Sequence, residues 1–290
     1  MAAPVIEDVP VGAAPSPAVE RERAQRVERR RRWRDRGIRV AVLVAVLAIW
    51  QLVTVLEIWP PLIVPRPSSV WDKFILSVTN HDGIKGLEGY YLWEHVAASA
   101  KRLVLGVLAA IVVGIPLGLL MATIRPVRIA LEPFVNFIRG LPPLAYFSLL
   151  IIWFGIEDTS KIWLLFLAAV APIALAVVAG VENARVEWIE AARSLGATRF
   201  QAIRTTVLPA VLPELFTAIR IAVGFAFTTI VAAETLNGIP GIGGMAWSTR
   251  KFNQTDIAIL CVIVIGVCAV AIDAGIRAIE RRVVPWKGKG

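Results

Sequence analysis

The chain has 290 residues, of which 57% are hydrophobic and only 18% are charged. Average soluble domains carry about 25% charged residues, so this composition excludes an ordinary soluble domain and indicates a protein that crosses a membrane several times. The net charge of +9 does not indicate nucleic-acid binding, because ten of the 31 Lys and Arg residues fall between Arg21 and Arg39, directly before an apolar run. Basic residues in that position are typical of a segment held at an anionic membrane leaflet.

The N-terminal region divides at about residue 38. Residues 1–37 are rich first in Ala, Pro and Val and then in Arg, which predicts a disordered, basic cytoplasmic tail. The apolar run 38–56 approaches the ~20 residues that a helix needs to cross a bilayer. It opens a region, 38–92, that we expect to hold the first transmembrane helix and an extracytoplasmic segment with prolines and interfacial aromatic residues.

Further apolar runs cover residues 103–124, 144–156, 162–181, 213–234 and 257–276. Together with the first run they predict an all-α membrane protein with six transmembrane helices. The run 144–156 is short for a full crossing unless the helical piece before it contributes, and Pro142 and Pro143 must break or kink the chain between the two. We expect residues 93–282 to form the membrane domain and residues 283–290 to form a cytoplasmic tail.

The run 103–124 carries a ridge of small residues. Ala110, Gly114, Gly118 and Ala122 recur every four residues and therefore lie on one face of a helix. Small side chains let two helix backbones approach closely, so the ridge predicts a tight contact with another transmembrane helix.

Lys and Arg are distributed unevenly between the two sides of the predicted helices. The N-terminal tail, the loops that begin near residues 125 and 182, and the C-terminal tail hold 21 of them, whereas the segments on the other side hold 8. Cytoplasmic segments carry an excess of Lys and Arg, so both termini and the loop 182–213 are predicted to lie in the cytoplasm.

The first half of the loop 182–213 predicts a short helix that ends at a glycine. An apolar face recurs at helical spacing and is formed by Trp188, Ala191, Ala192 and Leu195. Gly196 follows the last of these residues, where the C-terminus of a helix often needs a left-handed residue. Small side chains on this face would let another backbone approach closely.

The second half of the loop predicts another helix after the Gly196 corner. Thr198 precedes Gln201 by three residues, which is the pattern of a capping box at a helix start. An apolar face follows, formed by Phe200, Ile203 and Val207. Pro209 discourages continuation of that helix. Such a loop either docks on another protein or lies as an amphipathic segment on the bilayer surface.

Three ionisable residues, Arg220, Glu234 and Asp273, fall inside the last two apolar runs or at their ends. A self-contained, ion-coupled secondary transporter needs such groups near the membrane midplane. Arg220 and Asp273 lie close to the cytoplasmic ends of their runs, and Glu234 lies near the outer end of its own. Each therefore fits an interfacial or paired structural charge, although Arg220 is also a candidate for guiding an anionic substrate.

The sequence predicts no catalytic, cofactor or metal site. The only Gly-Lys pair, Gly288-Lys289, is followed by glycine rather than by the Ser or Thr of a nucleotide-binding loop. His81 and His95 stand isolated in a polar stretch without metal-ligand spacing. Energy for transport is therefore expected to come from a partner.

The loop motif Glu190-Ala191-Ala192, followed by Gly196 and by Leu208-Pro209, resembles the coupling loop of ABC importer permeases. One position departs from that family, which usually has Ile where this chain has Thr206. Other stretches resemble the nitrate, sulfonate and taurine branch of these permeases: LPPLAY at 141–146, IWFGI at 152–156, TSK at 159–161, VAAE at 231–234 and GIPGIGG at 238–244. The ending RRVVPW at 281–286 is similar to that of taurine permeases.

The resemblance implies a type I importer fold in a bacterial plasma membrane. It implies that two permease copies, commonly a homodimer in this branch, pair around the translocation path among membrane lipids. Two ATPase subunits would dock at the motif residues, and an extracytoplasmic binding protein would deliver taurine or a related sulfonate. Nitrate, another small anion or a pyrimidine precursor remains an alternative substrate.

Overall fold

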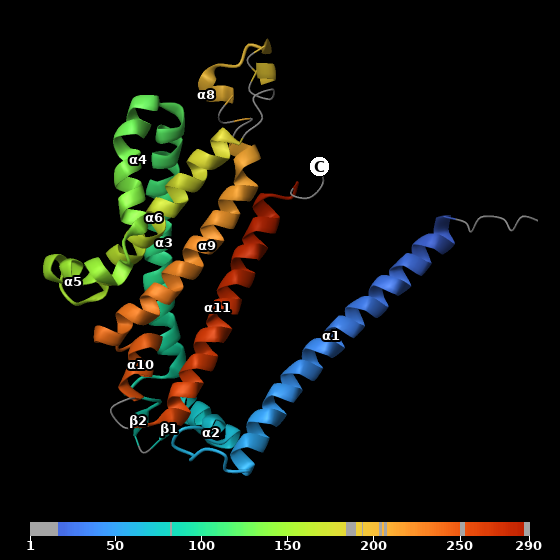
Figure 1. Cartoon of the computed structure of the whole chain (residues 1–290), viewed down its shortest axis with the longest axis vertical. Coiled ribbons are helices and arrows are strands. Elements are labelled where there is room, and N and C mark those ends of the chain that lie inside the picture. Colours follow the sequence, from blue (N-terminus) through green and yellow to red (C-terminus); the bar gives the residue numbers. More distant parts are fainter. Residues whose placement is uncertain are drawn as a thin grey trace, which may run out of the picture. The chain divides into compact units, whose positions relative to one another are not determined.

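The computed structural model describes residues 17–81, 83–183, 190–192, 194–202, 205, 208–249 and 253–286. The chain divides into two compact units, Met1–Pro61 and Leu62–Gly290, and each is described by itself. Both units are helical, and the second contains a single two-stranded β-sheet among its described residues (Figure 1).

The first unit contains helix α1 (Pro17–Val55), of which Arg29–Val55 is long and apolar enough to cross a membrane. The sequence predicts disorder through residue 37, but residues 17–37 are helical in the structure. Arg, Glu, Ala and Gln are good helix formers, and a helix that is already nucleated by its apolar half extends at little cost. The apolar half exposes side chains such as Val40 and Leu43, as a helix in contact with lipid does.

The second unit begins with α2 and a β-hairpin and continues as a bundle of helices (Figure 1). Its elements are α2 (Pro67–Val78), β1 (Asn80–His81), β2 (Ile84–Lys85), α3 (Leu92–Thr123), α4 (Arg125–Gly140), α5 (Pro143–Phe154), α6 (Asp158–Glu182), α8 (Arg199–Ala202), α9 (Leu208–Asn237), α10 (Ile242–Ser248) and α11 (Thr255–Val283). We call the end where α3 and α11 begin the hairpin end. The opposite end, where α6 ends and α9 begins, is the loop end.

Among the described residues, five helices are long and apolar enough to span a membrane, and these lie within α1, α3, α6, α9 and α11. Helices α4 and α5 together pass the same test but are bent by 100° at the break between them. Counting this pair as one broken span gives the six crossings that the sequence predicts, so the all-α membrane fold is confirmed.

The break between α4 and α5 falls at the predicted prolines. The N–H of Leu141 still donates to the carbonyl of Phe137, and Pro142 then caps α5, whose first residue is Pro143. Proline cannot donate a backbone hydrogen bond and fits the first turn of a helix, so it ends one helix and starts the next. The direction of α5 is fixed by packing, because its buried Phe147 belongs to an apolar cluster with Leu164 of α6.

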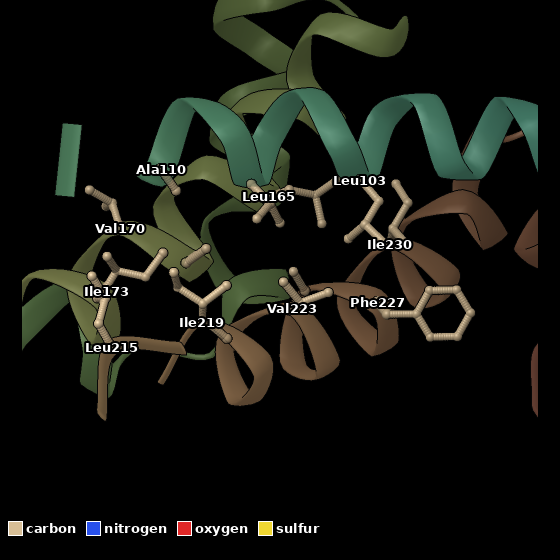
Figure 2. Packing of buried hydrophobic residues seen from close by; sticks show 14 of the residues in the cluster. Leu103, Ala110, Leu165, Val170, Ile173, Leu215, Ile219, Val223, Phe227 and Ile230 are labelled. Atoms are coloured by element: carbon tan, nitrogen blue, oxygen red, sulfur yellow. The ribbon is translucent and has the colours of Figure 1, made fainter. Parts of the chain in front are cut away.

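The core of the second unit lies between α3, α6 and α9. Side chains from all three helices meet there (Figure 2), including Leu103 of α3, Leu165 and Ile173 of α6, and Ile219 and Ile230 of α9. Helix α11 adds half-buried residues against this cluster, namely Ile265, Cys268, Ile272 and Ile276. Three mutually packed helices therefore form a rigid centre that connects the two ends of the unit.

The small-residue ridge of α3 faces α6, as the sequence predicts. A Cβ atom added to Gly114 would lie 3.1 Å from the Val170 carbonyl oxygen, and one added to Gly118 would lie 2.7 Å from Cβ of Val177. The contact at Gly118 is a clash, whereas at Gly114 the neighbouring atoms would have to give by a few tenths of an ångström, so the close approach of the two backbones depends most on Gly118.

The segment after Pro61 packs onto the second unit rather than with α1. Phe74 and Val78 of α2 pack against a cluster that contains Leu92 of α3 and Ile257 of α11. The division between units therefore falls at Pro61, whereas the sequence groups residues 38–92 together. Apolar residues of the amphipathic α2 find partners that lie far along the chain, which composition alone does not reveal.

Candidate functional site

The predicted coupling segment lies at the loop end, between the last residue of α6 and the first of α9. Within it Gly196 has a φ of +85°, and the N–H of Ala197 donates to the carbonyl of Ala192 at 3.0 Å. That bond joins the residue after the corner to the last helical turn, which is the pattern of a Schellman motif. The predicted glycine corner is therefore confirmed.

A capping box follows the corner, as predicted. The N–H of Thr198 donates to Oε1 of Gln201 at 2.8 Å, and the N–H of Gln201 donates to Oγ1 of Thr198 at 3.3 Å. Each side chain satisfies a backbone donor that the start of helix α8 would otherwise leave free. The predicted face residues Trp188, Ile203 and Val207 lie outside the described residues, as do Thr206 and the side chain of Phe200.

The described residues of this segment present an open surface. Glu190 and Ala191 are exposed, and Leu195 is 90% exposed directly before the Gly196 corner. A glycine corner that carries an exposed apolar side chain can enter a groove on another protein.

The second part of the motif joins this surface to the core. Leu208 and Pro209 are half-buried and form the first turn of α9. Val211 and Leu215 follow at once and are buried in the three-helix core. A displacement of the coupling segment would therefore act on the core through α9.

Arg220 and Asp273 belong to one cluster, the loop-end ion network, which consists of Arg220, Asp273, Arg277 and Glu280. Arg220 Nε lies 3.5 Å from Asp273 Oδ1, and Arg220 Nη2 donates to Glu280 Oε2. Arg277 Nη2 pairs with the other oxygen of Asp273 at 2.6 Å. The network holds two cations and two carboxylates and joins α9 to α11.

Glu234 lies in a second cluster at the other end of α9, the hairpin-end network, which consists of His95, Ser99, Arg102, Asp158 and Glu234. Glu234 is fully buried and accepts hydrogen bonds from Ser99 Oγ at 2.7 Å, Arg102 Nη1 at 2.6 Å and the N–H of Gly243 at 2.9 Å. Several donors satisfy this carboxylate, so it is held as a buried anion.

Arg102 ties this network to two further elements. Its Nε pairs with Asp158 of α6 at 2.6 Å, and its Nη1 also donates to the carbonyl of Pro240 at 2.9 Å. Arg102 is one of the eight Lys and Arg residues that the sequence assigns to the outer side, and its side chain is buried. It can stay charged there because two carboxylates flank it.

His95 is buried as well, although the sequence suggests an isolated polar residue. The N–H of Gly241 lies 3.1 Å from His95 Nδ1, and Nε2 lies 3.3 Å from the carbonyl of Leu87. Nδ1 also lies 3.0 Å from the carbonyl oxygen of Gly241, so both ring nitrogens contact backbone polar groups. The spacing of His95, Ser99 and Arg102, four and then three residues, places them on one face of α3, and this signal could have revealed the network.

The described residues contain no group of three or more His, Cys, Asp or Glu that could hold a metal ion. The charged side chains singled out above pair with one another between helices. This arrangement suits the mechanical joining of membrane helices and a docking surface at the loop end.

Residues 114–285 match the family described as "Binding-protein-dependent transport system inner membrane component". The chain is also 39% identical to the taurine transport system permease protein TauC of Escherichia coli K12, over 90% of this chain and 95% of that protein. The chain belongs to this family. It is a permease subunit of an ABC importer, hence a multi-pass transport component and not an enzyme.

Other similarities agree with this family. The permease is 32% identical to the nitrate import permease protein NrtB of Leptolyngbya laminosa, over 84% of this chain and 86% of that protein. A solved inward-facing structure of the MetNI methionine ABC transporter matches with a TM-score of 0.52 at 22% identity, over 64% of this chain and 96% of that one. This likeness shows the type I importer fold. Permeases of such importers work with ATPase subunits and a substrate-binding protein.

Proposed function

We propose that the permease forms the translocation path of an ATP-driven importer for taurine or related sulfonates. The observation that carries the substrate class is the similarity to TauC along nearly the whole of both chains. The coupling mechanism is supported by the segment at the loop end, where a helix, a glycine corner and a capped second helix present an exposed apolar tip.

The ATPase docking surface would consist of the motif residues. Glu190, Ala191 and Ala192 form the first helix, Gly196 forms the corner, and Leu208 and Pro209 lead into α9. Two ATPase subunits would each bind one such segment of a homodimer. Arg220, Glu234 and Asp273 serve as paired structural charges between helices, which is supported by the two ion networks.

The orientation that fits this role places both termini and the coupling segment in the cytoplasm, where ATP is available. The excess of Lys and Arg on that side supports it. The binding protein would then approach the hairpin end, while the exposed apolar faces of α1 and α11 would contact membrane lipid.

Reconstitution in liposomes tests the proposal. The purified permease alone should not accumulate taurine under a proton or sodium gradient, because its described ionisable residues at the candidate sites are paired. Addition of its ATPase, its binding protein and ATP should produce uptake, and loaded binding protein should raise the rate of hydrolysis.

Two other results would change the conclusion in different ways. Partner-dependent uptake that prefers nitrate or a pyrimidine precursor would keep the mechanism and refute the substrate. Accumulation on an ion gradient alone would refute the mechanism and support a secondary transporter.

A further inference from the structure

Helix α11 is held to the rest of its unit by few buried side chains. Its buried residues are Ile257, Leu260 and Cys261 near the hairpin end and then, nineteen residues later, Glu280. Between Cys261 and Glu280 the helix exposes apolar side chains such as Val267 and Val270. Half-buried apolar residues contact the core along this stretch, but at the loop end the buried group of α11 is a carboxylate.

That carboxylate is held by Arg220 of α9. The guanidinium contacts two acids of α11 that are two helical turns apart: Nη2 donates a hydrogen bond to Glu280, and Nε lies 3.5 Å from Asp273 in an ion-pair contact without a hydrogen bond. A residue spacing of seven places both acids on one face of α11. The two acids are separated by about 10 Å along the axis of α11, and a single guanidinium contacts both of them.

Arg220 also stands in line with the coupling segment. It lies twelve residues after Leu208 on the same helix, so about 18 Å of continuous helix separates it from the motif. Val211, Leu215 and Ile219 of that stretch are packed in the core. Any displacement of the coupling segment that moves α9 moves Arg220 with it.

We propose that Arg220 is a positioning residue for transport, which makes α11 follow α9 when ATPase subunits displace the coupling segment. This inference rests on the proposed function. Glu280 is buried, and separating Arg220 from it would leave an uncompensated buried charge, so this pair resists separation more strongly than apolar side chains that slide past one another. With apolar contacts alone, α11 would move less than α9 when the coupling segment is displaced.

A matched set of variants separates this role from simple structural support. Arg220→Lys keeps the charge but offers one nitrogen, which cannot reach both acids. Arg220→Glu combined with Glu280→Arg reverses and restores the pair between the helices. Arg277→Gln is the control, because Arg277 pairs with Asp273 within α11 and does not touch α9 in the contacts of the loop-end network.

The measurement is the distance between identical spin labels in the two copies of the complete permease–ATPase complex, with and without trapped ATP. Both cysteines are first replaced by alanine. A label at the exposed Thr217 then reports α9, and in a second sample one at the exposed Val270 reports α11. Neither sample requires knowledge of the transported substrate.

In the otherwise unaltered complex we expect ATP to shift both distances together. With Arg220→Lys the α9 shift should persist while the α11 shift falls to about half, because one of two carboxylate contacts is lost. The double variant re-forms the contact at position 280 but not the one with Asp273, so it should give a partial α11 shift like that of Arg220→Lys, and Arg277→Gln should leave both shifts unchanged.

An α11 shift that is equal with and without Arg220→Lys would overturn the inference. So would loss of both shifts in a folded Arg220→Lys complex, because Arg220 would then act on docking rather than between helices. Absence of any ATP-dependent shift in the unaltered complex would instead refute the proposed function itself.

Discussion

At the scale of single residues, Glu234 is the charged side chain that the fold buries most completely among the described residues. Its carboxylate has no exposed surface, and among the described residues its cationic partner within hydrogen-bond distance is Arg102. Removal of one partner from a buried ion pair leaves the other charge uncompensated, which costs about 3–5 kcal/mol. Breaking the pair should therefore destabilise the fold by more than the intact pair contributes to its stability.

Arg102→Leu should lower the free energy of unfolding of the purified permease by that amount. It removes the cation that pairs with Glu234 and the donor to the carbonyl of Pro240 in the Gly238–Gly244 loop. Lys101→Gln is the matched control, since Lys101 is the exposed neighbour of Arg102 on α3. Melting curves in detergent measure both. Equal melting temperatures for Arg102→Leu and the parent chain would contradict the assigned role.

The coupling segment offers a second test at this scale. Gly196→Arg forces a side chain into a left-handed conformation and places a bulky cation on the proposed docking surface, and Glu190→Lys reverses an exposed charge. A lost interface hot spot of 2 kcal/mol or more weakens binding by more than about tenfold. Both variants should insert in the membrane yet lose ATPase binding and uptake.

Gly196→Asn is the control for this experiment, because asparagine tolerates the left-handed region better than other residues do. It should retain most of the activity that Gly196→Arg loses. Full uptake by Gly196→Arg and Glu190→Lys would refute the docking surface, whereas degradation of both chains would point to a structural role for the segment.

At the scale of elements, the contact between α3 and α6 depends on the absence of side chains. A Cβ at Gly118 would meet Val177 and the carbonyl of Ala174, and neither the backbone nor a packed β-branched residue can move far. Gly118→Val should therefore lower the free energy of unfolding by about 1–3 kcal/mol through overpacking, which a lower melting temperature would show.

Gly224→Val is the matched control, because Gly224 lies on the exposed face of α9 and nothing stands within 4 Å of its added Cβ. It introduces the same side chain into a neighbouring transmembrane helix. If the two valine variants melted alike, the ridge would not be the basis of the contact between α3 and α6.

Elements governed by short-range chemistry are predictable from the sequence. The Gly196 corner, the box formed by Thr198 and Gln201, and the break at Pro142 and Pro143 each depend on residues at most a few positions apart. Their cause is backbone geometry, which neighbouring residues largely determine.

Contacts between distant residues are not predictable in the same way. Arg102 and Glu234 are 132 residues apart, and although the spacing of His95, Ser99 and Arg102 places them on one helix face, nothing local identifies the distant carboxylate that Arg102 pairs with. Residues 17–37 illustrate the opposite error: their charge suggests disorder, but continuity with the apolar part of α1 makes them helical. Burial and continuity are properties of the fold, so composition describes them poorly.

At the scale of the whole molecule, α9 connects the features that the function needs. It begins with the last residues of the coupling motif, packs in the three-helix core and contacts α11 through Arg220. Its last turn carries Glu234, which accepts a hydrogen bond from the Gly238–Gly244 loop. An ATPase that moves the loop end would thus act on the hairpin end through one continuous helix.

That scheme requires the coupling segment to lie in the cytoplasm, which can be tested by topology mapping. In a chain whose native cysteines are replaced, a membrane-impermeant maleimide applied from outside should label Asn80→Cys and miss Ser194→Cys. Asn80 is exposed in the β-hairpin and Ser194 is exposed in the coupling segment, so neither is shielded by its own chain. After the membrane is permeabilised, both should react. Labelling of Ser194→Cys but not of Asn80→Cys in intact membranes would reverse the orientation, and the docking of cytoplasmic ATPases at Glu190–Pro209 would have to be abandoned, because ATP is available on the cytoplasmic side.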